Sequence, residues 1–188
     1  MDGDPVWADT ALLIIDMINP LSFDGADRIT GDVEAAAEVI LRLRNRADAA
    51  RAPVVYVNDN FGCWSDDRRE IIARAAATSG PVSRISKRLE PRDRDIFIVK
   101  PQHSGFYGTS LPVLLPNIGA RRLVLTGLAA EFCVLFTAAD AFMRDYQVRV
   151  PANAVVAAKP ERLEWALDVM QSLGADTRRA SGDASPPL

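Results

Sequence analysis

The sequence predicts an α/β fold with three layers, in which a mainly parallel six-stranded sheet lies between two layers of helices. Apolar runs of strand length alternate along the chain with longer amphipathic segments, a pattern typical of parallel α/β domains. The first run, ALLIID at residues 11–16, is apolar up to its last residue, as expected of a strand that is covered on both faces. With 188 residues, 48% of them hydrophobic, the chain can form one domain with a sizeable core.

The other elements follow in order. Further strands are predicted at residues 53–59, 95–100, 121–127 and 147–157 (the last including its exit loop), with a short final strand at 175–180. Helices are predicted at residues 32–51, 66–78, 109–119, from the segment around Cys133 to about Tyr146, and at 160–174. The 32–51 segment has apolar residues at helical spacing, prolines make 109–119 short and irregular, and Gly174 closes the last helix.

We predict a single domain over residues 1–180 and a mobile tail at 181–188. The tail reads SGDASPPL and lacks any apolar periodicity, so it offers no face to bury. The motifs GxGxxG and GxxxxGK[ST] do not occur in the chain, which gives a dinucleotide-binding or P-loop function no support.

Composition excludes several classes of function. The formal charge of −3 lacks the basic excess that nucleic-acid binding requires. No run of about 18 apolar residues is present to span a membrane, and the acidic start of the chain is unlike a signal peptide. The two cysteines, Cys63 and Cys133, are too few for a disulfide framework and fit a reducing, cytoplasmic location. The single histidine argues against a charge-relay triad and against zinc.

Three polar residues stand at equivalent points of the strand and helix pattern. Asp16 ends the first strand, Lys100 ends the third, and Cys133 lies in the first turn of the helix after the fourth. In a parallel sheet these side chains should project from one edge. We expect the helix start and Lys100 to lower the pKa of the thiol, and Asp16 to accept its proton. An acid, a base and a nucleophile predict an enzyme.

Each residue also has a simpler interpretation. A lone cysteine on an apolar helix is often a core residue, an aspartate at a strand end is often a turn residue, and a lysine before proline is often solvated. Their joint occurrence at strand ends favours an active site. In the turn GLAAEFC at 127–133, the amides of Ala129 and Cys133 are expected to bind an oxyanion, and Gly127 permits a sharp exit from the strand.

Four segments resemble the isochorismatase-like cysteine hydrolase superfamily, which includes nicotinamidases and N-carbamoyl amidohydrolases. They are ALLIIDMIN (11–19), PVVYVNDNFGCW (53–64), KPQHSGFYGTSL (100–111) and GLAAEFCVLFTAADAFMRDYQVRV (127–150). The resemblance implies that Asp16, Lys100 and Cys133 form a catalytic triad and that the peptide bond between Leu128 and Ala129 is cis. It also implies the strand order 3-2-1-4-5-6, with the site between strands 1 and 4, and a homo-oligomer (a dimer or a tetramer).

Differences from the superfamily pattern limit which metal, substrate and cleaved bond we expect. Metal-dependent nicotinamidases of this superfamily bind zinc through an aspartate and histidines after the second strand. Here Asp59 is present, but residues 60–62 contain no histidine, so we predict no metal and no cofactor and expect a substrate other than nicotinamide. Members that cleave isochorismate often lack the cysteine, so the presence of Cys133 favours hydrolysis of a C–N bond.

The expected substrate is a small planar amide or carbamoyl compound. Five residues in loops after strand ends are candidate walls of its pocket: Asn19, Phe23, Trp64, Phe106 and Tyr107. The roles of His103 and Cys63 stay open at this stage. Two other functions also fit the sequence, namely a catalytically silent binding or regulatory protein and an ether or ester hydrolase that uses the same pocket.

Overall fold

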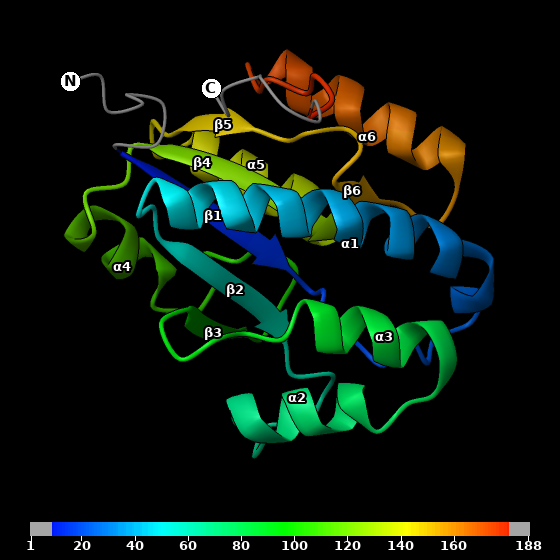
Figure 1. The fold of residues 1–188 in the computed structure, drawn as a ribbon. Helices are drawn as coiled ribbons and strands as arrows, with labels where there is room; N and C mark the ends of the chain where they lie inside the picture. Colours follow the sequence, from blue (N-terminus) through cyan, green and yellow to red (C-terminus); the bar gives the residue numbers. More distant parts are fainter. Residues whose placement is uncertain (1–8, 181–188) are drawn as a thin grey trace.

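A parallel sheet forms the centre of the fold, and helices cover both of its faces (Figure 1). This computed structural model describes residues 9–180, so the tail expected at 181–188 lies outside the described residues. The strands are β1 (Thr10–Ile15), β2 (Val54–Asp59), β3 (Ile96–Lys100), β4 (Arg122–Leu128), β5 (Gln147–Arg149) and β6 (Val155–Val156). The strand pairs are parallel, which confirms the predicted α/β class.

The predicted strand order is confirmed, since the sheet runs β3-β2-β1-β4-β5 and β6 pairs with β4. The strand expected at 147–157 is two short strands, β5 and β6, which both pair with β4. Pro151 lies between them and has no amide to donate to a ladder, and the amide of Ala154 turns back to the carbonyl of Pro151 at 2.8 Å. The last strand expected at 175–180 is only a single bridge between Arg149 and Asp176.

The helices form two layers. On one face lie α1 (Ala26–Ala49), α2 (Arg68–Ala76) and α3 (Gly80–Arg88), and on the other lie α4 (Leu111–Asn117), the π-helix η1 (Ala130–Val134), α5 (Leu135–Phe142) and α6 (Pro160–Ser172). Helix α1 begins six residues before the predicted start at 32 because Thr30 and Gly31, poor helix formers, are accommodated inside it. The hydroxyl of Thr30 bonds to the carbonyl of Ala26 at 2.8 Å. Helix α3 was not predicted.

The alternating side chains of β1 explain why its sequence is continuously apolar. Leu12 and Ile14 pack in the cluster with α1, α2 and α3. Leu13 and Ile15 point the other way, into the cluster with α4, α5 and α6. All four are fully buried, as expected for a central parallel strand.

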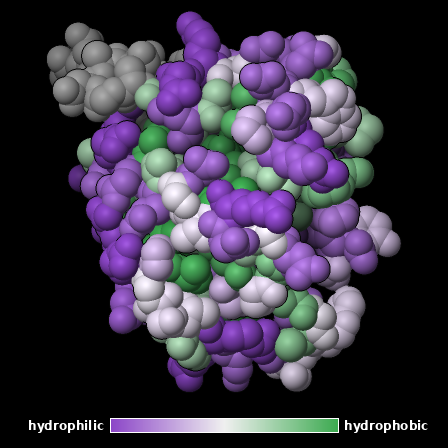
Figure 2. Space-filling view, turned by 90° about the vertical axis from the view of Figure 1, so that its right-hand side faces the viewer, coloured by the Kyte–Doolittle hydropathy of each residue, from purple (hydrophilic) through white to green (hydrophobic). Residues whose placement is uncertain are grey.

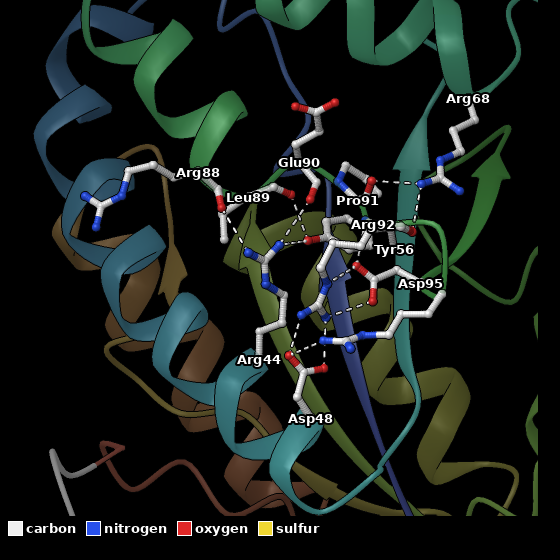
Figure 3. A network of polar contacts seen from close by, with 11 residues as sticks. Arg44, Asp48, Tyr56, Arg68, Arg88, Leu89, Glu90, Pro91, Arg92 and Asp95 are labelled. Carbon is white, nitrogen blue, oxygen red and sulfur yellow. Dashed lines mark hydrogen bonds and ion pairs between the residues drawn. The ribbon is translucent and has the colours of Figure 1, made fainter.

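A buried arginine connects the end of α3 to the sheet through hydrogen bonds (Figure 3). Arg44 on α1 is only 7% exposed and donates to the hydroxyl of Tyr56 at 2.9 Å, to the carbonyl of Arg88 at 3.0 Å and to that of Glu90 at 3.2 Å. The Tyr56 hydroxyl in turn donates to the carbonyl of Leu89 at 2.7 Å. The guanidinium thus supplies partners for carbonyl groups that the end of a helix leaves unpaired.

The same network sets the start of β3. Arg92 forms an ion pair with Asp48 on α1 and another with Asp95 at 2.9 Å (Figure 3). The Asp95 carboxylate also accepts the amide of Arg92 at 2.8 Å. Because Asp95 directly precedes β3, these contacts help to place the strand that ends with Lys100.

Candidate active site

Asp16, Lys100 and Cys133 meet at the carboxyl edge of the sheet. The Nζ of Lys100 lies 2.9 Å from Oδ2 of Asp16 and 3.4 Å from Sγ of Cys133. The exposed fractions are 4% for Asp16, 0% for Lys100 and 9% for Cys133. Because β3 lies beyond β2 in the sheet, Lys100 reaches past β2 to the end of β1. The structure therefore joins an anion, a cation and a thiol from three distant segments in one buried cluster.

Asp16 is held through both carboxylate oxygens. Its Oδ2 faces Lys100, and its Oδ1 accepts the amide of Asp59 at 2.6 Å. The backbone of Asp16 has φ 51°, in the left-handed region that aspartate tolerates better than most residues. Asp59 also adds a second carboxylate to the site, 3.3 Å from Nζ of Lys100.

Cys133 lies in a helical turn that is wider than an α-helical one. The amide of Val134 bonds to the carbonyl of Ala129, five residues earlier, at 3.1 Å, and such π-type turns occur frequently at functional sites. The peptide bond between Leu128 and Ala129 is cis. Just before it, Gly127 has φ 108°, and a Cβ there would lie 1.9 Å from the carbonyl oxygen of Ile15. Only glycine allows the backbones of β1 and β4 to approach each other this closely.

The environment of the thiol shifts its pKa in the direction opposite to the one expected. Burial raises the pKa of Cys133 to about 12, the carboxylate of Asp16 acts in the same direction, and Lys100 opposes both. Burial also raises the pKa of Asp16 against the attraction of Lys100. Burial lowers the pKa of Lys100, but Asp16 and Cys133 outweigh this effect and raise it. Burial and Asp16 thus favour the protonated thiol, whereas Lys100 favours the charged sulfur.

An open groove of about 610 Å³ lies beside this cluster. Trp64 and Tyr107 line it together with His103 and Phe136. Seen from the side toward which β1 and β2 point in Figure 1, hydrophilic residues cover most of the surface, and hydrophobic residues show in the gaps between them (Figure 2). His103 links the groove to the cluster, since its Nδ1 lies 3.8 Å from Sγ of Cys133.

The other three residues proposed as pocket walls have different surroundings. The side chain of Asn19 accepts the amide of Leu21 at 2.8 Å and so shapes its own loop. Phe23 is 47% exposed in the loop before α1. Phe106 is buried in the core, where its ring centroid lies 6.1 Å from that of Tyr146. The structure thus gives Phe106 a core environment in place of the predicted lining role, because its ring packs against Tyr146 and Arg144 in the segment after α5.

Sequence reasoning missed the residues that join the loop after β3 to the cysteine helix. The hydroxyl of Thr137 donates to the carbonyl of Cys133 at 2.6 Å and accepts the amide of Gly105 at 2.9 Å. One turn further, Asp140 accepts a hydrogen bond from the hydroxyl of Ser104. The spacing of residues 133, 137 and 140 places them on one helix face, a signal that could have identified them.

No group of three or more His, Cys, Asp and Glu residues suited to a metal ion occurs within residues 9–180. Asp59, where the resemblance places a zinc ligand in metal-dependent members, contacts Lys100 instead. In the same part of the chain, every helix is too short or too polar to cross a bilayer.

Comparison with known proteins agrees with this architecture. Residues 10–181 match the Isochorismatase domain. The chain is 37% identical over 166 residues to YaaI of Bacillus subtilis (strain 168), an uncharacterized isochorismatase family protein, with 88% of this chain and 91% of the relative covered. It is 33% identical to the ureidoacrylate amidohydrolase RutB of Pantoea ananatis (strain LMG 20103), over 81% of this chain and 71% of that protein.

A solved structure shows the same fold. The crystal structure of N-carbamoylsarcosine amidase from Thermoplasma acidophilum superimposes with a TM-score of 0.63 at 29% identity, and the match covers 94% of this chain and 99% of that one. The domain match and the relatives lead to one conclusion. The chain belongs to the isochorismatase family.

Proposed function

We propose that this protein is a cysteine-dependent amidohydrolase that cleaves the C–N bond of a small amide or carbamoyl compound. The observation that carries the proposal is the contact of one ammonium group, on Lys100, with both the carboxylate of Asp16 and the sulfur of Cys133. The named activities of two relatives, a ureidoacrylate amidohydrolase and an N-carbamoylsarcosine amidase, support a carbamoyl or carboxamide substrate.

In the first half of the proposed reaction, Cys133 attacks the substrate carbonyl. Because burial favours the protonated thiol, the proton of Cys133 moves to Asp16 as the C–S bond forms. The raised pKa of Asp16 makes this carboxylate a better base than an ordinary aspartate. The amides of Ala129 and Cys133 hold the oxyanion.

In the second half, ammonia or an amine leaves with the proton from Asp16, and a thioester remains on Cys133. Water then hydrolyses the thioester and returns the free thiol. Lys100 stays charged throughout, since its pKa is raised by its anionic neighbours. Its charge orients Asp16 and offsets the negative charge that develops on the sulfur.

We also propose a homo-oligomer in a reducing, cytoplasmic compartment. Large apolar side chains that stay exposed on the outer helices support the association, with Val113 on α4 66% exposed and Met143 beside α5 68% exposed. A nucleophilic cysteine without a disulfide partner supports the reducing compartment.

A panel of carboxamide and carbamoyl substrates, scored by ammonia release, tests the proposed function. Cys133→Ala is expected to abolish the release, and Lys100→Met is expected to lower it strongly. Cys63→Ala is the matched control, since it removes the other cysteine and should retain full activity. Ammonia release that survives Cys133→Ala would remove the sulfur from the chemistry.

A further inference from the structure

His103, the only histidine of the chain, is held beside the sulfur of Cys133. Its Nδ1 lies 3.8 Å from Sγ. The imidazole stacks on Phe132 with 5.4 Å between the ring centroids and contacts Phe136 with 5.7 Å. Phe132 lies on η1 beside Cys133, and Phe136 lies one turn further, on α5. Because α5 directly continues η1, the same run of helix positions the sulfur and the imidazole.

The imidazole lies on the solvent side of the sulfur. Lys100, which contacts Sγ at 3.4 Å, is fully buried, and Asp16 is nearly so. His103 is exposed and lines the open groove with Trp64. The sulfur thus has Lys100 and Asp16 on its buried side and the imidazole on the side that is open to the groove.

We propose that His103 is a catalytic residue that activates the water that hydrolyses the acyl-enzyme. The inference rests on the thioester of the proposed function. Nε2 takes a proton from water as the water oxygen bonds to the acyl carbon. The C–S bond then breaks, its electron pair goes to Sγ, and Sγ takes the proton from Nδ1. The products are the free acid, the thiol and a neutral imidazole.

Histidine suits this step because one ring nitrogen can accept a proton while the other donates one. The geometry indicates which nitrogen does which. Nδ1 faces the sulfur and can donate to it, and the far side of the exposed ring is open to the groove, where Nε2 can accept a proton from water. Asp16 then serves mainly the acylation half of the reaction, in which it accepts the proton of Cys133.

The test separates the two halves with p-nitrophenyl acetate, whose nitrophenolate leaves without needing a proton. In His103→Gln we expect a rapid burst of about one nitrophenolate per protein, followed by a steady rate that is about 10²- to 10⁴-fold below that of the native protein. Mass spectrometry should show acetyl groups accumulating on Cys133. Asn117→Ala, a change at an exposed residue at the end of α4 that does not line the groove, is the control and should leave the steady rate unchanged.

Chemical rescue separates a chemical role from a packing role. Added imidazole should restore the steady rate of His103→Ala, because the site of the lost ring is open to the groove. A native steady rate in His103→Gln, or an equal loss of burst and steady rate that imidazole does not reverse, would overturn the role of His103. If Cys133→Ala keeps both the burst and the steady rate, the proposed function itself fails.

Discussion

Thr137 offers a sharp test of how the site is held together, because its hydroxyl and its methyl group can be removed separately. The side chain is fully buried, and the hydroxyl joins the carbonyl of Cys133 to the amide of Gly105. Thr137→Val keeps the shape and removes both hydrogen bonds. Thr137→Ser keeps the hydroxyl and removes only the methyl group.

The expected costs follow from these contacts. In Thr137→Val the buried amide of Gly105 is left without a partner, which should lower the free energy of unfolding by about 1–3 kcal/mol. Loss of the hydrogen bond to the Cys133 carbonyl should lower it by about 1 kcal/mol more, so that the total is about 2–4 kcal/mol. Thr137→Ser loses one buried methyl group and should cost about 1 kcal/mol. The more hydrophobic substitution should therefore be the more harmful one.

Urea unfolding followed by tryptophan fluorescence measures both costs as a change in midpoint multiplied by the slope m. The ammonia-release rate should follow the same order, because the loop that carries His103 loses the Gly105 hydrogen bond to the cysteine helix in Thr137→Val and keeps the one from Ser104 to Asp140. If Thr137→Val proves as stable as Thr137→Ser, the hydroxyl does not hold the loop and the reasoning fails.

Three further outcomes are expected. Gly127→Ala should destabilise the fold by about 3–5 kcal/mol in urea unfolding, since its Cβ would enter the backbone of β1; a native midpoint would contradict this close approach. Arg44→Met should cost about 3–5 kcal/mol, because it removes the donor of the Tyr56 hydroxyl and of two backbone carbonyls. Arg84→Met, which breaks an exposed ion pair, should cost less than about 1 kcal/mol. Equal costs would show that the buried network does not stabilise the fold. Asp16→Asn should lower the pKa of Cys133 because it removes a charge that raises it, so iodoacetamide should label Cys133 faster near pH 9 while hydrolysis is lost; slower labelling would reverse the assigned effect of the carboxylate.

The sequence predicted the elements that depend on local pattern. Strand and helix alternation identified the parallel α/β class, whereas the order of β1 to β5 followed from the resemblance to the isochorismatase-like superfamily. Errors arose where local pattern is weak. Thr30 and Gly31 obscured the first turns of α1, and the two-residue strand β6 is stable only because Gly127 and Leu128 of β4 lie beside it.

In the candidate site too, some residues could be predicted from local pattern and others could not. Asp16, Lys100 and Cys133 could be singled out because the carboxyl ends of parallel strands share one edge. Asp59 obeys the same rule, since it ends β2 beside Lys100 in the sheet. The contact of His103 with Cys133 could not be predicted, since it depends on how the loop after β3 folds back over that edge.

By itself, the sequence determined which chemical groups arrive at the edge of the sheet, because the length and periodicity of each segment decide where a strand ends. The tertiary structure alone decided the direction in which the pKa of Cys133 shifts, because the pKa depends on burial and on charges contributed by distant strands. It also decided which group faces the thiol from the groove. The distances from Cys133 to Asp16, Lys100 and His103 are set by packing between segments far apart in the chain, and no local pattern encodes them.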